Sequence, residues 1–395
     1  MMLLDAVGRK PTHANAADAR PAYYFVVGGR GQCQAYGRAT PVQGRKKSIS
    51  KFLVWGRLGS VNIRQSTPRL FSITRQRQFR KSILAWYGLH RRDLPWRASR
   101  DPYRVWLSEI MLQQTRVAAV LEHYREFLRR FPAVEKLAAA REASVLAAWS
   151  GLGYYRRARM LHAAAKVIVR RHGGRFPATT NGLRTLPGIG RYTAAAIASI
   201  AFEEPVATVD GNVERVLQRV SGKRLAGEEL WTAANHLLDA KRPGDFNQAM
   251  MELGATVCTP RAPDCLTCPV VELCATRGEL AATTRPARQK KREIHYALDY
   301  RGRDRRDGEV FLIRRPSDAS LMPGMWELPE LPAANGTGKP SFALRHSVTV
   351  TDYTVRVWHA ASPSRVAGKW VPLERLRQVA LTGLARKILR KSEVL

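Results

Sequence analysis

Two carboxylic acids in the middle of the chain have surroundings that suit acid–base chemistry. Glu109 lies in the apolar helical stretch Leu107–Leu112, where burial would raise its pKa and keep a proton available for donation. Asp210 precedes the helical stretch Glu214–Val220, and a helix N-terminus favours the anionic form of an acid. One neutral and one charged carboxyl group can together break a glycosidic bond. Taken alone, Glu109 could be a surface acid and Asp210 a simple helix cap, so the surrounding motifs must decide.

Four of the five cysteines are clustered, whereas Cys33 stands alone. The cluster consists of Cys258, Cys265, Cys268 and Cys274. Such a cluster indicates a metal site, and zinc held by four thiolates is one interpretation. Structural zinc sites usually combine two Cys-x-x-Cys pairs, and only one such pair occurs here. The irregular spacing therefore favours a 4Fe–4S cluster over zinc.

The string Leu186-Pro-Gly-Ile-Gly190, followed by the helical stretch Arg191–Ile197, predicts two helices joined by a tight turn. Glycines let the backbone approach a ligand, and the first N–H groups of the second helix point outward. This geometry suits a DNA phosphate and reads no base. An ordinary αα-hairpin is the alternative, and the strongly basic composition favours a helix-hairpin-helix motif that binds DNA.

The composition points to a polyanionic partner. The 395 residues include 66 Lys and Arg against 32 Asp and Glu, which gives a formal net charge of +34. A hydrophobic content of 45% excludes a wholly disordered chain. No run reaches the ~18 apolar residues of a membrane-spanning helix, and the start does not resemble a secretory signal. We therefore expect a cytoplasmic, nucleoid-associated protein.

The chain divides into four regions. Residues 1–75 are basic and lack periodicity, so they represent a disordered arm, a transit peptide or upstream sequence included by a misplaced start codon. Residues 76–282 predict an all-α domain of about ten helices, with the helix-hairpin-helix at 179–200 and the cysteine loop at 258–274. Residues 283–295 form a basic linker. Residues 296–395 predict an α+β domain with strands at 309–313 and 348–358 and a closing helix at 373–389.

Several long strings resemble the A/G-specific adenine DNA glycosylases of the helix-hairpin-helix superfamily, and the resemblance covers about residues 76–282. It rests on Trp86-Tyr, Arg92-Asp-Leu-Pro-Trp-Arg97, Pro102 to Thr115, Trp149 to Ala158, Leu186 to Ala194, Val209 to Val216 and the four-cysteine loop. The resemblance implies removal of adenine mispaired with 8-oxoguanine or guanine in double-stranded DNA, by a monomer that carries one 4Fe–4S cluster.

The resemblance also implies residue roles. Glu109 would protonate the adenine, Asp210 would stabilise the cationic sugar, and Tyr192 and Asn212 would line the same site. Residues at the DNA would be the base-stack wedges Gln114 and Tyr154, together with Gly188, Gly190 and Arg191. Residues around the extruded base would be Arg92, Trp96, Arg97 and Leu112, with Gln248 and Glu252.

Tyr192 bears on the reaction type. Bifunctional relatives that resemble endonuclease III place a lysine at this position, and its amine forms a Schiff base with the sugar. A phenol cannot form that imine, so we expect hydrolysis without strand cleavage. The alternatives are a lyase of the endonuclease III type, a catalytically inert DNA-binding protein, and a tRNA-binding protein, which would explain the charge but not these strings.

The C-terminal region resembles the lesion-sensing, Nudix-like domain of the same family, through Arg314-Arg-Pro, Leu321 to Pro329 and Arg345-His-Ser. It lacks the Glu-Glu pair of catalytic Nudix enzymes, so we expect no nucleotide hydrolysis. Many relatives carry Phe-Ser-His where this chain has Val348-Thr-Val350. Thr349 offers a hydroxyl but no imidazole, and we expect a weaker preference for 8-oxoguanine over guanine.

Overall fold

The computed structural model describes residues 71–278, 280, 290–302, 307–332, 339–348, 351–362 and 366–395. Nearly all of the predicted extension 1–75, most of the predicted linker 283–295, and Thr349 lie outside the described residues. Within the described ranges, the helices are too short or too polar to cross a bilayer.

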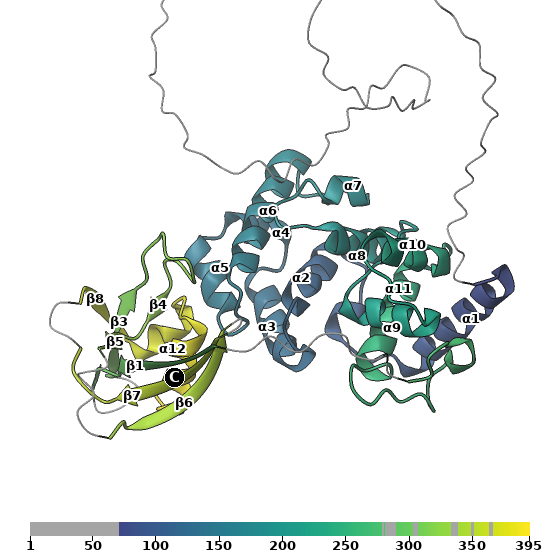
Figure 1. Ribbon diagram of the computed structural model, residues 1–395. Coiled ribbons are helices and arrows are strands. Elements are labelled where there is room, and N and C mark those ends of the chain that lie inside the picture. Colours follow the sequence, from purple (N-terminus) through teal and green to yellow (C-terminus); the bar gives the residue numbers. More distant parts are fainter. Residues whose placement is uncertain are drawn as a thin grey trace, which may run out of the picture. The chain divides into compact units, whose positions relative to one another are not determined.

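Residues 71–278 fold into α-helices and short 3-10 turns, without a strand in that range. The elements are α1 (Ile73–His90), η1 (Pro95–Arg97), α2 (Pro102–Leu112), α3 (Val117–Arg130), α4 (Val134–Ala139), α5 (Glu142–Trp149), α6 (Arg156–His172), α7 (Thr180–Leu183), α8 (Arg191–Phe202), α9 (Gly211–Ser221), α10 (Glu228–Leu237), α11 (Pro243–Thr256) and η2 (Val271–Leu273). Figure 1 shows them as one continuous group of helices.

This helical region has two apolar cores. The first is built by α2 to α6 and α8, and includes Trp106, Phe127 and Trp149. The second is built by α1 and α9 to α11, and the cysteine loop packs on its edge. Because α2 belongs to the first core and α9 to the second, Glu109 and Asp210 are supplied from opposite sides of the boundary between the cores.

The helix-hairpin-helix consists of α7, a turn over residues 184–190, and α8. The Thr179 side chain accepts a hydrogen bond from the N–H of Gly182 and so caps α7. Gly188 has φ of +74°, and a Cβ there would lie 2.5 Å from the Cβ of Met160. Only glycine allows α6 and this turn to approach so closely.

The C-terminal region contains two small sheets, with strand orders β5-β1-β7-β6 and β2-β3-β4, and β8 also pairs with β3. The strands are β1 (Lys290–Ala297), β2 (Tyr300–Arg301), β3 (Glu309–Arg314), β4 (Trp326–Glu327), β5 (Glu330–Leu331), β6 (Phe342–Val348), β7 (Thr351–Trp358) and β8 (Gly368–Pro372). The turn η4 (Leu373–Gln378) and the helix α12 (Gly383–Lys391) follow. Buried residues of β3, β7 and α12 form a third apolar core, which makes this an α+β unit.

Three details of the C-terminal region differ from expectation. The strand β1 begins at Lys290, inside the predicted linker. The strand predicted over 348–358 begins later, as β7 at Thr351, because Val348 is the last residue of β6 and pairs with Thr351. The helix predicted over 373–389 is interrupted, since Val379 is extended and Thr382 caps a new helix by accepting from the N–H of Ala385.

The C-terminal region contacts the helical region through hydrogen bonds and apolar packing. The carbonyl oxygen of Leu381 accepts from the Tyr155 hydroxyl at 2.7 Å and from the Ser150 hydroxyl at 2.9 Å. Met325 and Ala380 are buried in the first helical core. The two hydroxyl groups flank the segment 151–154, which carries the predicted wedge residue Tyr154.

Candidate active site

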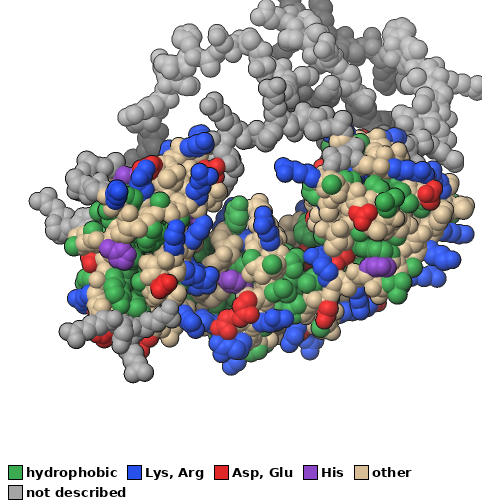
Figure 2. All heavy atoms as spheres, turned by 90° about the horizontal axis from the view of Figure 1, so that it is seen from below, with side chains coloured by type: hydrophobic (Ala, Val, Ile, Leu, Met, Phe, Trp, Pro, Cys, Tyr) green, Lys and Arg blue, Asp and Glu red, His purple; other side chains and the backbone are tan. Residues whose placement is uncertain are grey.

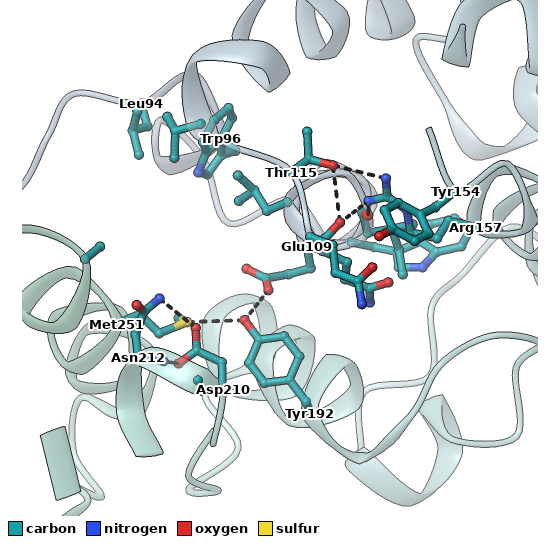
Figure 3. A pocket seen from close by; sticks show the side chains of 18 of the residues that line it. Leu94, Trp96, Glu109, Thr115, Tyr154, Arg157, Tyr192, Asp210, Asn212 and Met251 are labelled. Carbon is teal, nitrogen blue, oxygen red and sulfur yellow. Dashed lines mark hydrogen bonds between the residues drawn. The ribbon is translucent and has the colours of Figure 1, made fainter. Parts of the chain in front are cut away.

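Glu109 and Asp210 line a single cavity of about 1010 Å³. Tyr192 and Asn212 line the same cavity, and the side chains of all four approach one another in Figure 3. The cavity far exceeds the size of one purine and extends along α2, α6, α9 and α11. The two acids, which lie far apart in the sequence, therefore both line the same cavity.

The carboxyl group of Glu109 is enclosed on helix α2, with 8% of the residue exposed. The Tyr192 hydroxyl donates to its Oε2 at 2.7 Å and also lies 3.3 Å from the Met251 sulfur. Burial raises the pKa of Glu109 to about 7, although the hydrogen bond from Tyr192 opposes the rise. A carboxyl group with this pKa can hold a proton near neutral pH and release it to a bound base.

Asp210 is the N-cap of α9 and has more hydrogen-bond donors than Glu109. Its Oδ1 accepts from the N–H groups of Asn212 at 2.9 Å and Val213 at 2.8 Å, and its Oδ2 accepts from the Asn212 amide at 3.0 Å. Burial raises the pKa of Asp210, while these three donors counteract that rise. Asp210 accepts three hydrogen bonds and Glu109 accepts one, so Asp210 is the acid that loses its proton first as pH rises.

Glu252 on α11 holds two arginines at one wall of the cavity. Its carboxylate accepts from Arg92 Nε at 2.7 Å and from Arg97 Nη2 at 2.7 Å, with 1% of its side chain exposed. Trp96 is buried beside them with its ring edge-on to Tyr124, and Leu112 and Gln248 also line the cavity. All six residues expected around the extruded base therefore border this space.

Replacing Glu252 with glutamine should make the stability of the fold less sensitive to a fall in pH. Burial raises the pKa of Glu252, but hydrogen bonds from both arginines outweigh it and lower the pKa to about 2. A depressed pKa means stability that is present above pH 4.5 and lost as pH falls toward 2, amounting to about 3 kcal/mol. Urea unfolding at several pH values should show this loss in the wild type and a shallower one in the Glu252→Gln variant.

Glu126→Gln is the matched control for that measurement. The Glu126 carboxylate also pairs with two arginines, Arg129 and Arg130, but on the partly exposed surface of α3. Solvent screening should limit its contribution to about 1 kcal/mol or less. Equal acid dependence in the Glu252→Gln variant and the wild type would refute the assignment.

The two predicted wedge residues share an uncommon backbone conformation. Gln114 has φ of +54° and Tyr154 has φ of +47°, and both line the cavity. Left-handed backbone at residues other than glycine is costly and persists only where surrounding contacts impose it. Tyr154 is also 49% exposed, so its ring is available at the cavity mouth.

The hairpin residues are divided between the cavity and the surface. Gly188 lines the cavity, whereas Gly190 is the N-cap of α8 outside it. Arg191 lies on the outer side as well, where it pairs with Glu228 and stacks 3.9 Å from the centre of the Trp231 ring. Arg191 therefore lies away from the cavity, with its guanidinium in contact with Glu228 and Trp231.

The four clustered cysteines line a second, small cavity together with apolar residues of α9 and α11. The Arg219 guanidinium lies 3.3 Å from the Cys258 sulfur and donates to the carbonyl of Thr259 at 2.7 Å. Among the described residues, no three His, Cys, Asp or Glu side chains converge closely enough for one metal ion. Four thiols that line one small cavity can serve together as ligands of a metal group.

Three residues of the site were not predicted from the sequence. Met251 contacts the Tyr192 hydroxyl, and Arg215 donates to Asn212 Oδ1 at 2.9 Å and to the carbonyl of Cys258 at 2.8 Å. Arg157 contacts several carbonyls of the wedge segments. Side chains that act by binding backbone carbonyls leave no motif of their own, although Arg157 does lie inside a string that resembles the family.

Comparison with known proteins agrees with this architecture. Residues 107–230 match the model of the HhH-GPD superfamily base excision DNA repair protein. The chain thus contains a helix-hairpin-helix domain of this superfamily. Adenine DNA glycosylase of Mus musculus is 48% identical over 224 residues, which cover 52% of this chain and 44% of that protein.

Two other relatives are matched over a larger share of their length. Adenine DNA glycosylase of Rattus norvegicus is 37% identical over 359 residues, covering 76% of this chain and 67% of that protein. The Schizosaccharomyces pombe enzyme of the same name is 34% identical over 319 residues, covering 64% and 69%. The chain belongs to the adenine DNA glycosylase family. It spans less than half the length of the mouse and human relatives that it matches.

Proposed function

We propose that this protein hydrolyses the N-glycosidic bond of adenine mispaired with 8-oxoguanine or guanine in duplex DNA, and leaves an abasic site. The main support is the joint placement of Glu109 and Asp210 in one cavity, with the pKa of Glu109 raised to about 7 and Asp210 held by three donors. These are the two carboxyl states that acid-assisted glycoside hydrolysis requires.

The reaction begins with extrusion of the adenine, because the base inside a duplex is out of reach of Glu109. Protonation of a purine ring nitrogen by Glu109 makes adenine a leaving group. The C–N bond breaks, and the anionic Asp210 stabilises the positive charge on the sugar. Glu109 then accepts a proton from the attacking water. Tyr192 orients the Glu109 carboxyl group throughout.

The reaction stops at the abasic site, because the side chains around the cavity offer no amine for a Schiff base. Tyr192 occupies the position of the lyase lysine, and no lysine is among the described residues that line the cavity. Borohydride added during turnover on an adenine substrate should therefore trap no covalent adduct. An adduct formed through a lysine of the protein would overturn the monofunctional assignment.

Duplex DNA is the partner that best matches the surface. Figure 2 shows Lys and Arg side chains outnumbering Asp and Glu on the face that it presents. The helix-hairpin-helix turn places backbone N–H groups of α8 and Arg191 at the protein surface. Phosphate contacts of this type position the duplex and leave sequence unread. The protein acts on this duplex as a monomer.

The C-terminal α+β unit is a Nudix-like lesion-recognition domain in this proposal. The segment 348–350 joins β6 to β7, and its central residue Thr349 lies outside the described part of the chain. A threonine lacks the imidazole that many relatives place there. We therefore propose that the enzyme distinguishes 8-oxoguanine from guanine only weakly.

Single-turnover excision from duplexes with adenine opposite 8-oxoguanine, guanine, cytosine and thymine tests the activity and its selectivity. Excision opposite 8-oxoguanine and guanine at similar rates, with little opposite cytosine or thymine, is the expected result. Absence of excision from every duplex would refute the glycosylase assignment. A strong preference for 8-oxoguanine over guanine would refute only the proposed weak discrimination between the two bases. In that case, the Thr349→His variant should show the same preference as the wild type.

The cysteine loop holds a 4Fe–4S cluster in this proposal. Four thiolates from Cys258, Cys265, Cys268 and Cys274 would bind its irons, and Arg219 would offset their negative charge. When bound, the cluster supplies a rigid cross-link for the loop. Arg215 ties that loop to Asn212, beside the catalytic Asp210.

Chemical analysis of protein purified without oxygen separates the two metal interpretations. The cluster predicts about four irons with an equal amount of acid-labile sulfide per chain. One zinc per chain with no sulfide would support the mononuclear site instead. Cys268→Ser should lower the bound iron and the unfolding temperature, whereas the Cys33→Ser control should change neither.

A further inference from the structure

Arg157, at the start of α6, joins the segment that carries Glu109 to the segment that carries Tyr154. Its Nη1 donates to the carbonyls of Ile110 at 2.7 Å, Met111 at 3.0 Å and Gln113 at 2.6 Å. These are orphan carbonyls at the C-terminal end of α2, just beyond Glu109. A guanidinium at this end of a helix donates hydrogen bonds to these carbonyls, and its positive charge interacts favourably with the helix dipole.

The other side of the same guanidinium holds the turn around Tyr154. Arg157 Nη2 donates to the carbonyl of Leu152 at 3.1 Å, and also to Thr115 Oγ1 at 3.1 Å. The central carbon of the guanidinium, Cζ, lies 5.5 Å from the Tyr154 ring centre and 5.4 Å from that of Trp149. Figure 3 shows Arg157 between Thr115 and Tyr154.

The contacts of Arg157 surround both residues with left-handed backbone. Gln114 lies between Gln113 and Thr115, which both accept from Arg157, and Tyr154 follows Gly153 and precedes Arg157 by three positions. A conformation of positive φ must be imposed by neighbours. Among the described residues, Arg157 is the side chain whose hydrogen bonds reach the neighbours of both.

On the basis of these contacts we propose that Arg157 is a positioning residue, which holds Gln114 and Tyr154 ready to enter the base stack when DNA binds. The inference rests on the proposed function. Its planar fork bridges acceptors on two segments, a geometry that the compact ammonium of lysine does not reproduce. If Gln114 and Tyr154 are already held in place, less conformational entropy is lost when the base is extruded. A misplacement of a reacting group by about 1 Å can lower the rate about 100-fold.

Arg157→Met and Arg157→Lys test the inference against Arg171→Met, which removes an exposed charge from the same helix. Single-turnover excision is measured with adenine mispaired with guanine, and with adenine opposite an abasic site, where less unstacking is needed. Arg157→Met should lose about 100-fold on the mispair and clearly less on the second duplex. Arg157→Lys should be intermediate, and Arg171→Met should match the wild type.

Fluorescence of 2-aminopurine at the target position reports extrusion directly. The signal should rise on binding the wild type and rise less with Arg157→Met. Equal rate losses on both duplexes, accompanied by a lower unfolding temperature, would make Arg157 merely structural and overturn the inference. Wild-type rates for Arg157→Met or Arg157→Lys would overturn it too. A wild-type protein that excises no adenine from either duplex would instead refute the proposed function.

Discussion

Replacing Glu109 with glutamine is expected to lower the single-turnover rate of adenine excision by about 1,000-fold, within the range that general acid–base groups contribute. Glutamine keeps the shape of the side chain and its hydrogen bond with Tyr192, so affinity for the mispaired duplex should be retained. Excision rates with excess enzyme and binding by fluorescence anisotropy provide the two measurements. A Glu109→Gln variant with near-normal excision would remove Glu109 from the mechanism.

The same variant should change the pH dependence of both rate and stability. Because burial raises the pKa of Glu109 to about 7, the reactive protonated form declines above that pH and the wild-type rate should fall. A raised carboxyl pKa also means that stability is lost as pH rises from 4.5 through 7, by up to about 3 kcal/mol. Glu109→Gln should therefore be more stable than the wild type at pH 8, although it is far less active.

Replacing Asp210 with asparagine is expected to lower excision by about 100-fold to 1,000-fold, because the negative charge beside the developing sugar cation is lost. Asparagine is as good an N-cap as aspartate, so α9 should keep its start and the fold its stability. Asp210→Ala removes the cap as well and should cost about 1 kcal/mol of stability in addition. Thermal unfolding of both variants separates the two roles.

The outcome of Asp210→Asn is informative in either direction. A rate loss without a stability loss supports an electrostatic role at the reaction centre. A rate close to that of the wild type, measured under single-turnover conditions on the same mispair, would show that Asp210 serves only as a helix cap.

The positions of the two acids could be anticipated because local sequence determines each environment. Apolar neighbours at helical spacing bury Glu109, and Asp210 stands directly before a helix. That both side chains line one cavity follows instead from the way the two apolar cores meet, which no local pattern encodes. The family resemblance provided that link.

Other parts depend on contacts that sequence patterns leave open. Arg191 was expected at DNA, but its pairing with Glu228 and Trp231 requires α10 to fold back on α8. Arg157 acts through backbone carbonyls, so the identity of the residues it holds is invisible in the sequence. In the C-terminal unit, apolar and polar residues alternate on both sides of positions 349 and 350, and a strand pattern therefore cannot reveal where β6 ends.

Burial of Met325 and Ala380 inside the first helical core makes the two folded regions share an interior. A protein shortened before Met325 would expose part of the first helical core to water. It would also leave the Ser150 and Tyr155 hydroxyls without their carbonyl acceptor. Deletion is thus a poor way to ask what the C-terminal unit senses, since lost activity would mix recognition with damage to the segment that carries Tyr154. Point substitutions on its outer strands avoid that confusion.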